Sequence, residues 1–262
     1  MLKFSQQNIP FNDFQNIIKY VKIIILNFLI NEGFCMILDK ANIIRQKRKS
    51  VKISINSGGE LTIICPFNLP YTKLEEIVKS KESLLNKKIK NAAKIENDNK
   101  EIINYKKILL LGKEYYIIPT DKVGKAYFAD DNFLVPYKYT LEKSKLTNFI
   151  KKNLKEIATK VIKNRVNDIV KSHANFNKIN NISIGSFKSK WGSCDSLCNV
   201  KFNWKVVMLC PKLIDFIIFH ELTHLKELNH SQLFYKNLQN VCPDHKQSRL
   251  DLKKYSFLLT LY

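Results

Sequence analysis

The sequence predicts an α+β protein, in which a β-rich N-terminal part with one helix precedes a part with a long helix, a small sheet and a helical C-terminus. Three observations support this. Apolar and polar residues alternate over short segments before residue 139, a helical period runs from about residue 141 to 176, and a very apolar helix follows two later strands. We expect an N-terminal extension over 1–40, a β-rich subdomain over 41–139 and a C-terminal domain over 140–262.

The β-rich part has two strand regions with a helix between them. "VKISINSGGELTIICP" alternates on both sides of Ser57-Gly58-Gly59, which predicts two strands joined by a glycine turn and ending at Pro66. Residues 72–95 then have helical spacing, and Thr72 followed by Glu75 resembles a capping box. "KKILLLGKEYYIIP" and "KAYFADDNFLVP" predict further strands before a seam near residues 139 and 140.

The C-terminal part begins with the long helix, and its strands follow. Residues 141–176 carry an apolar stripe at helical spacing that extends from Leu146 to Ile169. "NISIGSFKSKWGSC" predicts a strand that ends in a glycine loop, and "NVKFNWKVVML", residues 199–209, predicts the next strand.

Two helices complete the predicted fold. Pro211 suits the first turn of a helix, which we expect to continue to about Leu228. Ser231 is a suitable N-cap for a following helix that stops before Pro243.

The composition is that of a globular protein with a strongly basic surface. Of 262 residues 45% are hydrophobic, and the net charge is +21. Arginine supplies only 4 of the 44 basic side chains, although its planar fork dominates phosphate and base recognition. The charge is also spread along the chain, so nucleic acid stays an alternative partner that we do not favour.

Six cysteines without a dense framework, and no convincing export signal, predict reduced thiols and a cytoplasmic protein. The apolar run Ile23 to Ile30 is interrupted by Asn27 and is too short to span a bilayer. We therefore expect no stable membrane insertion. The sequence gives no indication of the oligomeric state.

The segment "IDFIIFHELTHLKELNH" concentrates the chemistry of the chain. In a helix, His220 and His224 lie about one turn apart on one face, so their imidazoles can share one Zn²⁺ ion. Glu221 is rotated by about 100° from His220. It is therefore placed to take a proton from a metal-activated water rather than to ligate the ion. This H-E-x-x-H arrangement is typical of zinc hydrolases.

The third metal ligand is open among several side chains. His230 follows His224 by six residues, as in longer zinc motifs, although Glu227 stands where those motifs have glycine. The helix must end for His230 to return, and Asn229 suits a left-handed stop. Glu227 ranks second and His245 third as the ligand. Cys194 and Cys198 are a weak basis for a second zinc site, and His173 is expected to be a surface residue at a helix end.

The segment from Phe187 to Lys246 resembles the YgjP-like metallopeptidase family, which is related to the SprT and WLM zinc peptidases. The resemblance rests on Lys190-Trp191-Gly192-Ser193-Cys194, Asn203-Trp204, Asp215-Phe216, the run His220 to Phe234 and Cys242-Pro243-Asp244-His245. It covers about residues 42–255. It implies a zincin-like catalytic domain with His220, His224 and His230 as ligands and Glu221 as general base or acid.

Two positions depart from the family pattern. His245 replaces the usual tyrosine, which puts in doubt any role of that position in holding the oxyanion, and Lys190 stands where arginine is common.

These observations predict a zinc metallopeptidase that holds one Zn²⁺ ion and cleaves peptides or proteins. Trp191, Asn203 and His245 are candidate substrate-binding residues, and the strand from Asn199 to Leu209 is a candidate edge for an extended substrate. The alternatives are a non-catalytic binding module with a structural metal and a DNA-associated protease.

Overall fold

A computed structural model describes residues 36–261 apart from 57–58, 123, 174–175 and 177. The chain divides into two compact units between Asn91 and Ala92. The apolar run Ile23 to Ile30 lies outside the described residues. Within the described part, no helix combines the length and the apolar character needed to cross a membrane.

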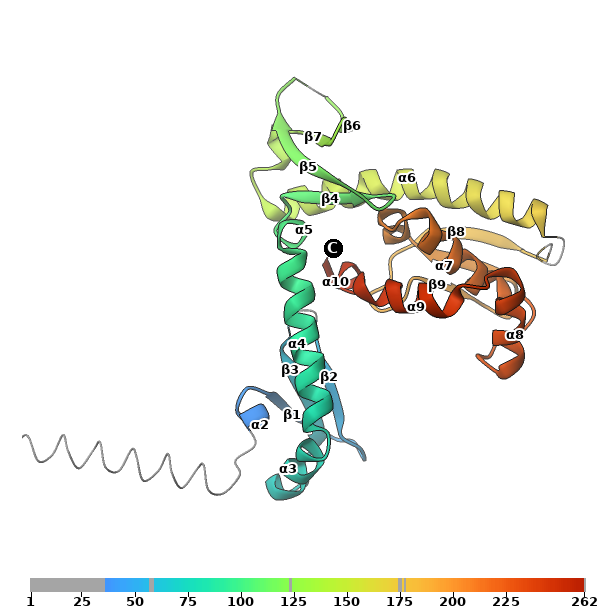
Figure 1. The fold of residues 1–262 in the computed structure, drawn as a ribbon. Coiled ribbons are helices and arrows are strands. Elements are labelled where there is room, and N and C mark those ends of the chain that lie inside the picture. The colour runs from blue at the N-terminus through green and yellow to red at the C-terminus, as the bar shows by residue number, and fades with distance from the viewer. Residues whose placement is uncertain (1–35, 57–58, 123, 174–175, 177, 262) are drawn as a thin grey trace, which may run out of the picture. The chain divides into compact units, whose positions relative to one another are not determined.

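The first unit is a three-stranded sheet with helices (Figure 1). The central strand β3 pairs in parallel with β1. It pairs antiparallel with β2, and these are the two strands predicted on either side of the glycine turn. Alternate residues of β3, Leu61, Ile63 and Cys65, are buried with Leu74 and Val78 of the first helix after the sheet. The elements are α2 (Met36–Asp39), β1 (Asn42–Gln46), β2 (Lys52–Ile55), β3 (Leu61–Pro66), α3 (Tyr71–Lys79) and the start of α4 (Glu82–Asp98).

The predicted cap at Thr72 is wrong. Helix α3 begins one residue earlier, at Tyr71, with Pro70 at the N-cap and no side-chain cap. Proline has no side-chain acceptor, so the first N–H groups of α3 receive no side-chain cap from this residue. Thr72 is an exposed residue of the first turn.

The second unit begins with a four-stranded sheet of order β4-β5-β7-β6. Its elements are α5 (Lys100–Ile103), β4 (Lys107–Leu110), β5 (Lys113–Thr120), β6 (Tyr127–Ala129) and β7 (Asn132–Pro136). Ile108, Leu109, Phe133 and Val135 of this sheet join the same buried core as the C-terminal helices. The strands before residue 139 thus belong to both compact units, and the limits of the domains stay a prediction.

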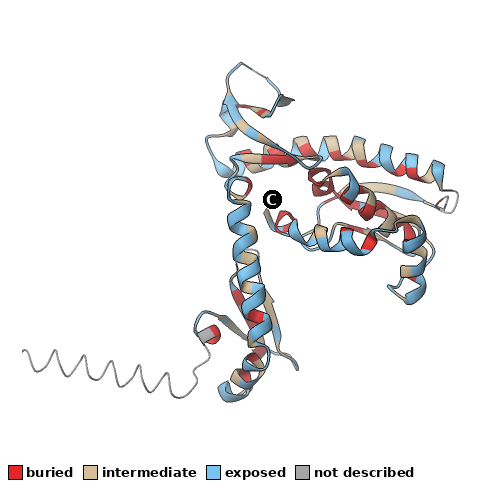
Figure 2. Ribbon diagram, in the orientation of Figure 1, coloured by how far each residue is buried: buried red, intermediate tan, exposed pale blue. Residues whose placement is uncertain are grey.

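The long helix is α6 (Lys143–Ser172), which confirms the helical period read from the sequence. Its buried side chains recur every three or four residues, and Figure 2 shows them as a red stripe along one face. This face packs against β8 (Asn181–Gly185) and against the 3₁₀ turn Trp204–Met208.

The third sheet has the order β8-β10-β9, with β9 (Gly192–Cys194) antiparallel to β10 (Asn199–Asn203). Two expectations were wrong here. Residues 192–194 form a strand rather than a loop, and the predicted strand 199–209 ends at Asn203 because Trp204–Met208 is a 3₁₀ turn. Since β10 is the central strand, the edges of this sheet are β8 and β9, and β10 is not available to another chain.

Four helices follow: α7 (Pro211–Thr223), α8 (Gln232–Val241), α9 (His245–Lys254) and α10 (Leu258–Leu261). Pro211 stands at the start of α7, and α8 stops before Pro243, as the sequence predicts. Helix α7 contacts α6, α8, α9 and β9. It is therefore the element around which the rest of this unit is arranged.

Candidate metal centre

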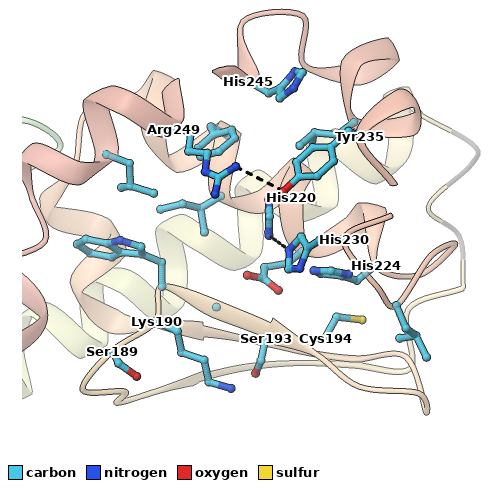
Figure 3. A pocket seen from close by; sticks show the side chains of 18 residues that line it. Ser189, Lys190, Ser193, Cys194, His220, His224, His230, Tyr235, His245 and Arg249 are labelled. Carbon is cyan, nitrogen blue, oxygen red and sulfur yellow. Dashed lines mark hydrogen bonds between the residues drawn. The ribbon is translucent and has the colours of Figure 1, made fainter. Parts of the chain in front are cut away.

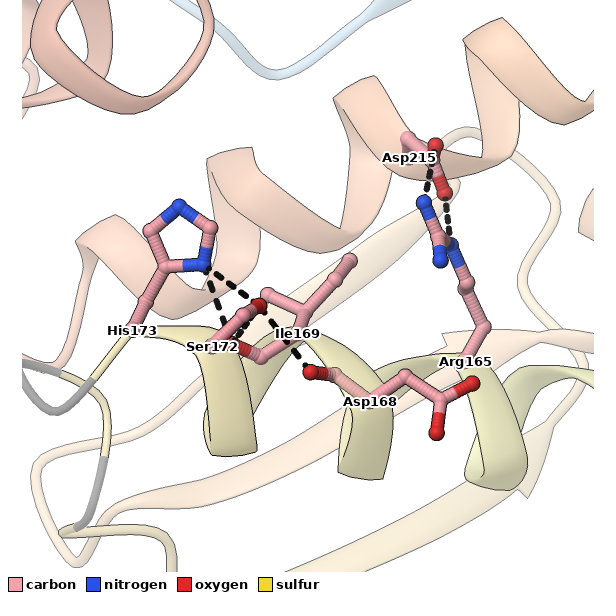
Figure 4. Close-up of polar contacts among 6 residues, drawn as sticks. All are labelled: Arg165, Asp168, Ile169, Ser172, His173 and Asp215. Atoms are coloured by element: carbon pink, nitrogen blue, oxygen red, sulfur yellow. Dashed lines mark hydrogen bonds and ion pairs between the residues drawn. The ribbon is translucent and has the colours of Figure 1, made fainter.

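Helix α7 carries His220 and Glu221 on a buried, well-anchored scaffold. Ile214, Ile217, Ile218 and Leu222 are almost completely buried, so the orientation of the helix is set by core packing. Near its N-terminus, Asp215 accepts two hydrogen bonds from Arg165 of α6, at 2.6 and 2.8 Å (Figure 4). This fork ties α7 to the long helix and limits its rotation.

His173 takes no part in the metal centre. It stands at the C-cap of α6, where its Nδ1 lies 3.1 Å from the carbonyl oxygen of Ile169 and 3.0 Å from the Ser172 hydroxyl (Figure 4). Its ring meets Phe219 of α7 edge to face, with centroids 5.4 Å apart. His173 is half-buried at the helix end and joins α6 to α7.

The end of α7 differs from its predicted position, and this difference creates the return of His230. The helix stops at Thr223 rather than near Leu228, and His224 is its C-cap. Among the described residues, the non-glycine positions with left-handed backbone do not include Asn229, so the predicted stop at Asn229 is wrong. Instead, tight turns follow Thr223, and the Nδ1 of His224 lies 3.0 Å from the carbonyl oxygen of Glu227.

This contact also orients the His224 ring. A carbonyl oxygen can only accept, so Nδ1 carries the proton and the lone pair of Nε2 is available to a metal ion. A ligating histidine usually donates its second ring N–H to such a partner. Glu227 thus contributes through its backbone, and its carboxylate is not part of the histidine group.

The start of α8 fixes the other side of the histidines. The Ser231 hydroxyl accepts a hydrogen bond from the backbone N–H of Phe234, at 3.2 Å, which is the N-cap that the sequence predicts. Phe234 is fully buried, and its ring centroid lies 5.1 Å from His220, 4.5 Å from His224 and 4.8 Å from His230. One aromatic side chain thus contacts all three imidazoles and restricts their orientations.

His220, His224 and His230 converge. Their ligand atoms lie within 4.8 Å of one another, and the Nε2 atoms of His220 and His230 are 3.0 Å apart. A tetrahedral zinc ion bound at about 2.0–2.1 Å holds two ligand nitrogens roughly 3.3 Å apart, so this spacing fits a shared ion. In the part of the chain that the structure describes, no cysteine or carboxylate completes the group. Three nitrogen donors without a fourth are the donor set of catalytic rather than structural zinc.

The electrostatic environment favours the neutral form of two of these rings, His220 and His230. Burial, followed by the charges of His224 and His230, lowers the pKa of His220 to about 3. Burial, followed by the charges of His224 and Arg249, also lowers the pKa of His230. Because a metal ion binds the unprotonated nitrogen, the imidazoles of His220 and His230 are ready to bind a cation at neutral pH.

Glu221 is a buried carboxylate on the same helix. Burial raises its pKa to about 7, and the charge of Lys190 opposes that shift. Positive charge held at the histidines would likewise favour the carboxylate and lower this pKa. A group that can both accept and release a proton near neutral pH suits acid–base chemistry.

Gly192 of β9 explains how a strand approaches Glu221 so closely. A Cβ atom at Gly192 would lie 2.6 Å from Cγ of Glu221 and 2.8 Å from its Oε1, closer than any side chain tolerates. The Trp-Gly-Ser sequence is therefore not only a turn signal. The glycine leaves the space that the glutamate occupies.

One cavity of about 740 Å³ is lined by the three converging histidines and by Glu221. Figure 3 shows the labelled histidines with β9 on one side and α9 on the other. The residues that line the cavity come from β9 and the loop before it, α7, the following turns, α8 and α9: Ser189, Lys190, Trp191, Gly192, Ser193, Cys194, Phe216, Ile217, His220, Glu221, His224, Leu228, His230, Tyr235, Leu238, His245, Arg249 and Leu252.

The candidate substrate-binding residues separate into two groups. Half-buried Trp191 and buried His245 line the cavity. Asn203 does not, because its amide donates to the carbonyl oxygens of Phe187, at 2.9 Å, and Lys190, at 3.1 Å. Asn203 therefore holds the loop that leads to Trp191.

Sequence reasoning did not identify Tyr235 and Arg249, which also line the cavity. Arg249 follows His245 by four residues, so helical spacing would have placed both on one face of α9 had that helix been predicted. Tyr235 carries no comparable signal. The pair Cys194 and Cys198 is not part of any metal-ligating group of three or more in the described part of the chain.

Comparison with known proteins agrees with this geometry. The family model described as YgjP-like, metallopeptidase domain, matches residues 49–255. No curated protein and no solved structure matches the chain. The match spans most of the sequence, including the three histidines and Glu221, and the chain therefore belongs to the YgjP-like metallopeptidase family.

Proposed function

We propose that the protein is a zinc-dependent peptidase in which His220, His224 and His230 hold one Zn²⁺ ion and Glu221 is the general base. The observation that carries this proposal is the convergence of three imidazoles, within 4.8 Å, in a cavity that also holds a buried glutamate. A metal-dependent peptidase is also what membership of the family implies.

The ion would polarise the carbonyl of the peptide bond and lower the pKa of a bound water. Glu221 accepts a proton from the attacking water and then donates it to the leaving amine, so one carboxyl serves as base and as acid. Gly192 leaves room for this carboxylate beside β9. Phe234 and the Glu227 carbonyl keep the imidazoles in place.

The structure also suggests how a peptide would lie in the cavity. Strand β9 is at the edge of its sheet, and Gly192, Ser193 and Cys194 line the cavity. An extended peptide can pair with such an edge through its backbone. Because backbone hydrogen bonds are the same for every sequence, many peptides could bind in this geometry. This arrangement favours a peptide or protein substrate in an extended conformation.

The test combines metal analysis with peptide cleavage. The purified full-length protein should contain about one zinc ion per chain, as the three-histidine donor set implies. It should also cleave members of a proteome-derived peptide library. Glu221→Gln should keep the metal and lower kcat by about 10²–10⁴-fold, the usual contribution of a general base.

Two outcomes would reject the proposal. Equal cleavage by the wild type and Glu221→Gln would exclude Glu221 as the base. Bound zinc without cleavage of any peptide by the wild type would instead indicate a non-catalytic metal-binding module.

A further inference from the structure

The cavity has an unbalanced charge. Glu221 is the one carboxylate among the residues that line it, whereas Lys190 and Arg249 are both cationic. The histidines add a site for a further positive ion. A cavity with this distribution attracts negatively charged groups.

Arg249 differs from Arg165 and Arg45 in how its guanidinium is used. Arg165 forms a fork with Asp215, and Arg45 donates to the carbonyl oxygens of Pro66, Phe67 and Leu69. The only hydrogen bond found for Arg249 among the described residues goes to the Tyr235 hydroxyl, at 3.4 Å, and no described carboxylate lies within 4.0 Å of it. Most N–H donors of Arg249 therefore face the cavity or solvent.

Tyr235 adds a donor to this wall, and His245 packs behind it. Figure 3 shows Arg249 and the Tyr235 hydroxyl approaching each other above His220. Because the Tyr235 oxygen accepts from Arg249, its own O–H remains a donor. Behind it, His245 is 5% exposed, stacks on Tyr235 with centroids 6.2 Å apart, and its Nδ1 has no hydrogen-bond partner among the described residues.

The charge of Arg249 reaches the histidines. After burial and the neighbouring imidazoles, it is a further cause that lowers the pKa of His220 and His230. The Tyr235 ring, whose hydroxyl accepts from Arg249, has its centroid 6.2 Å from that of His230, so Arg249 lies close to the candidate metal centre.

We propose that Arg249, oriented by the Tyr235 hydroxyl, binds a carboxylate of the peptide substrate close to the bond that is cleaved. A guanidinium fork matches a carboxylate in shape and charge, and the remaining donors on this wall need an acceptor. The inference rests on the proposed peptidase function and narrows its substrates. The carboxylate is an acidic side chain or the free C-terminus of the peptide.

The experiment starts from a peptide that the zinc-loaded full-length protein cleaves. Matched peptides carry Glu or Gln at each of the positions flanking the cleaved bond, and a free or an amidated C-terminus. The wild type should show a higher kcat/KM, by about ten- to a hundred-fold, when the carboxylate is present at one of these places. The position of that preference distinguishes a side chain from a C-terminus.

Arg249→Gln should reduce this ratio of kcat/KM values to about one, and Tyr235→Phe should reduce it partly. Lys253→Gln is the matched control, since it removes the same charge from an exposed position on the same helix. It should retain the preference. An unchanged ratio in Arg249→Gln would overturn the proposal, as would a kcat that falls equally for acidic and neutral peptides. The proposal would also be overturned if Lys190→Gln lost the preference for the acidic peptide while Arg249→Gln retained it.

Binding measurements separate this inference from the proposed function. Fluorescence anisotropy with Glu221→Gln protein compares the affinities of the Glu and Gln peptides without turnover, with and without Arg249→Gln. Tighter binding of the acidic peptide that depends on Arg249 supports the carboxylate site even if no peptide is cleaved. Equal affinities in both proteins overturn it, even if the peptidase reaction is confirmed.

Discussion

The cavity has two kinds of wall, and they are built differently. One wall, formed by α7, the turns after it and the start of α8, supplies the three histidines from residues 220–230. The facing walls, β9 and α9, come from separate segments at 192–194 and 245–254. The first wall supplies the nitrogen atoms that could bind a metal ion, and the facing walls limit which substrate groups can reach that ion.

This difference separates metal binding from substrate handling. Loss of a histidine from the first wall should affect the metal itself, whereas changes at Glu221 or in β9 should leave the metal bound and impair the reaction. A histidine of the first wall and the glycine of β9 are therefore the two positions at which to separate these effects.

Replacing His230 by alanine should have the largest effect. The variant loses one of three nitrogen ligands, so zinc affinity should fall by more than the 10–100-fold that loss of an outer contact costs, and peptide cleavage should cease. His245→Ala is the matched control, because His245 lines the same cavity outside the histidine group. Zinc titration with a competing chelator measures both. Equal zinc affinity in His230→Ala and the wild type would show that His230 is not a ligand.

Gly192→Ala should come next, because it alters the facing wall at Glu221. The new methyl group would overlap Cγ and Oε1 of the carboxylate, so the carboxylate or the strand must shift. A displacement of about 1 Å at a reacting group costs roughly a hundredfold in rate, and we expect kcat/KM to fall by about that factor. Zinc content should stay at the wild-type level.

Gly124→Ala serves as its control, since no atom lies within 4 Å of a Cβ at that position. Peptide cleavage by both variants, with zinc analysis of each, decides the question. A fully active Gly192→Ala protein would mean that Glu221 is not constrained by β9.

The wall that carries the three histidines was predictable from the sequence because the signals for it lie close together in the chain. His220 and His224 follow from the helical repeat, and Ser231 marks the next helix start through its own side chain. The contact of Gly192 with Glu221 and the placement of Arg249 depend on packing between distant segments, for which a single sequence has no periodic signal. The predicted strand 199–209 was too long because the β-branched residues of the buried 3₁₀ turn Trp204–Met208 resemble those of a strand.

Two hydroxyl residues show when a cap signal is reliable. Ser231 accepts from the Phe234 N–H, whereas Thr72 follows a proline N-cap and makes no cap. Ser231→Ala should lower the free energy of unfolding by about 1 kcal/mol, and Thr72→Ala should change it by less than about 0.5 kcal/mol. Urea denaturation of both variants gives these values. Similar losses for the two would remove the distinction.

The smallest expected effect concerns the turn that joins β9 to β10. The Asp195 carboxylate accepts hydrogen bonds from the backbone N–H groups of Leu197 and Asn199, at 2.9 and 3.0 Å, while Cys198 takes a left-handed conformation. The hydrogen bonds from Asn199, followed by that from Leu197, lower the pKa of Asp195. A pKa that is lower in the folded state stabilises the fold above the unfolded value of about 3.9. That contribution is lost as the pH falls through the folded value.

Asp195→Ala should therefore melt slightly below the wild type at pH 7, and the difference should shrink as the pH falls below about 3.9 and through the lower folded value. The side chain is exposed, so the effect is small, but its sign is fixed by the hydrogen bonds. Thermal melts of both proteins across this range measure it. A difference in melting temperature that persists unchanged in acid would show that the aspartate stabilises the turn through its shape rather than its charge. The stability of the turn at the end of β9 would then not depend on pH.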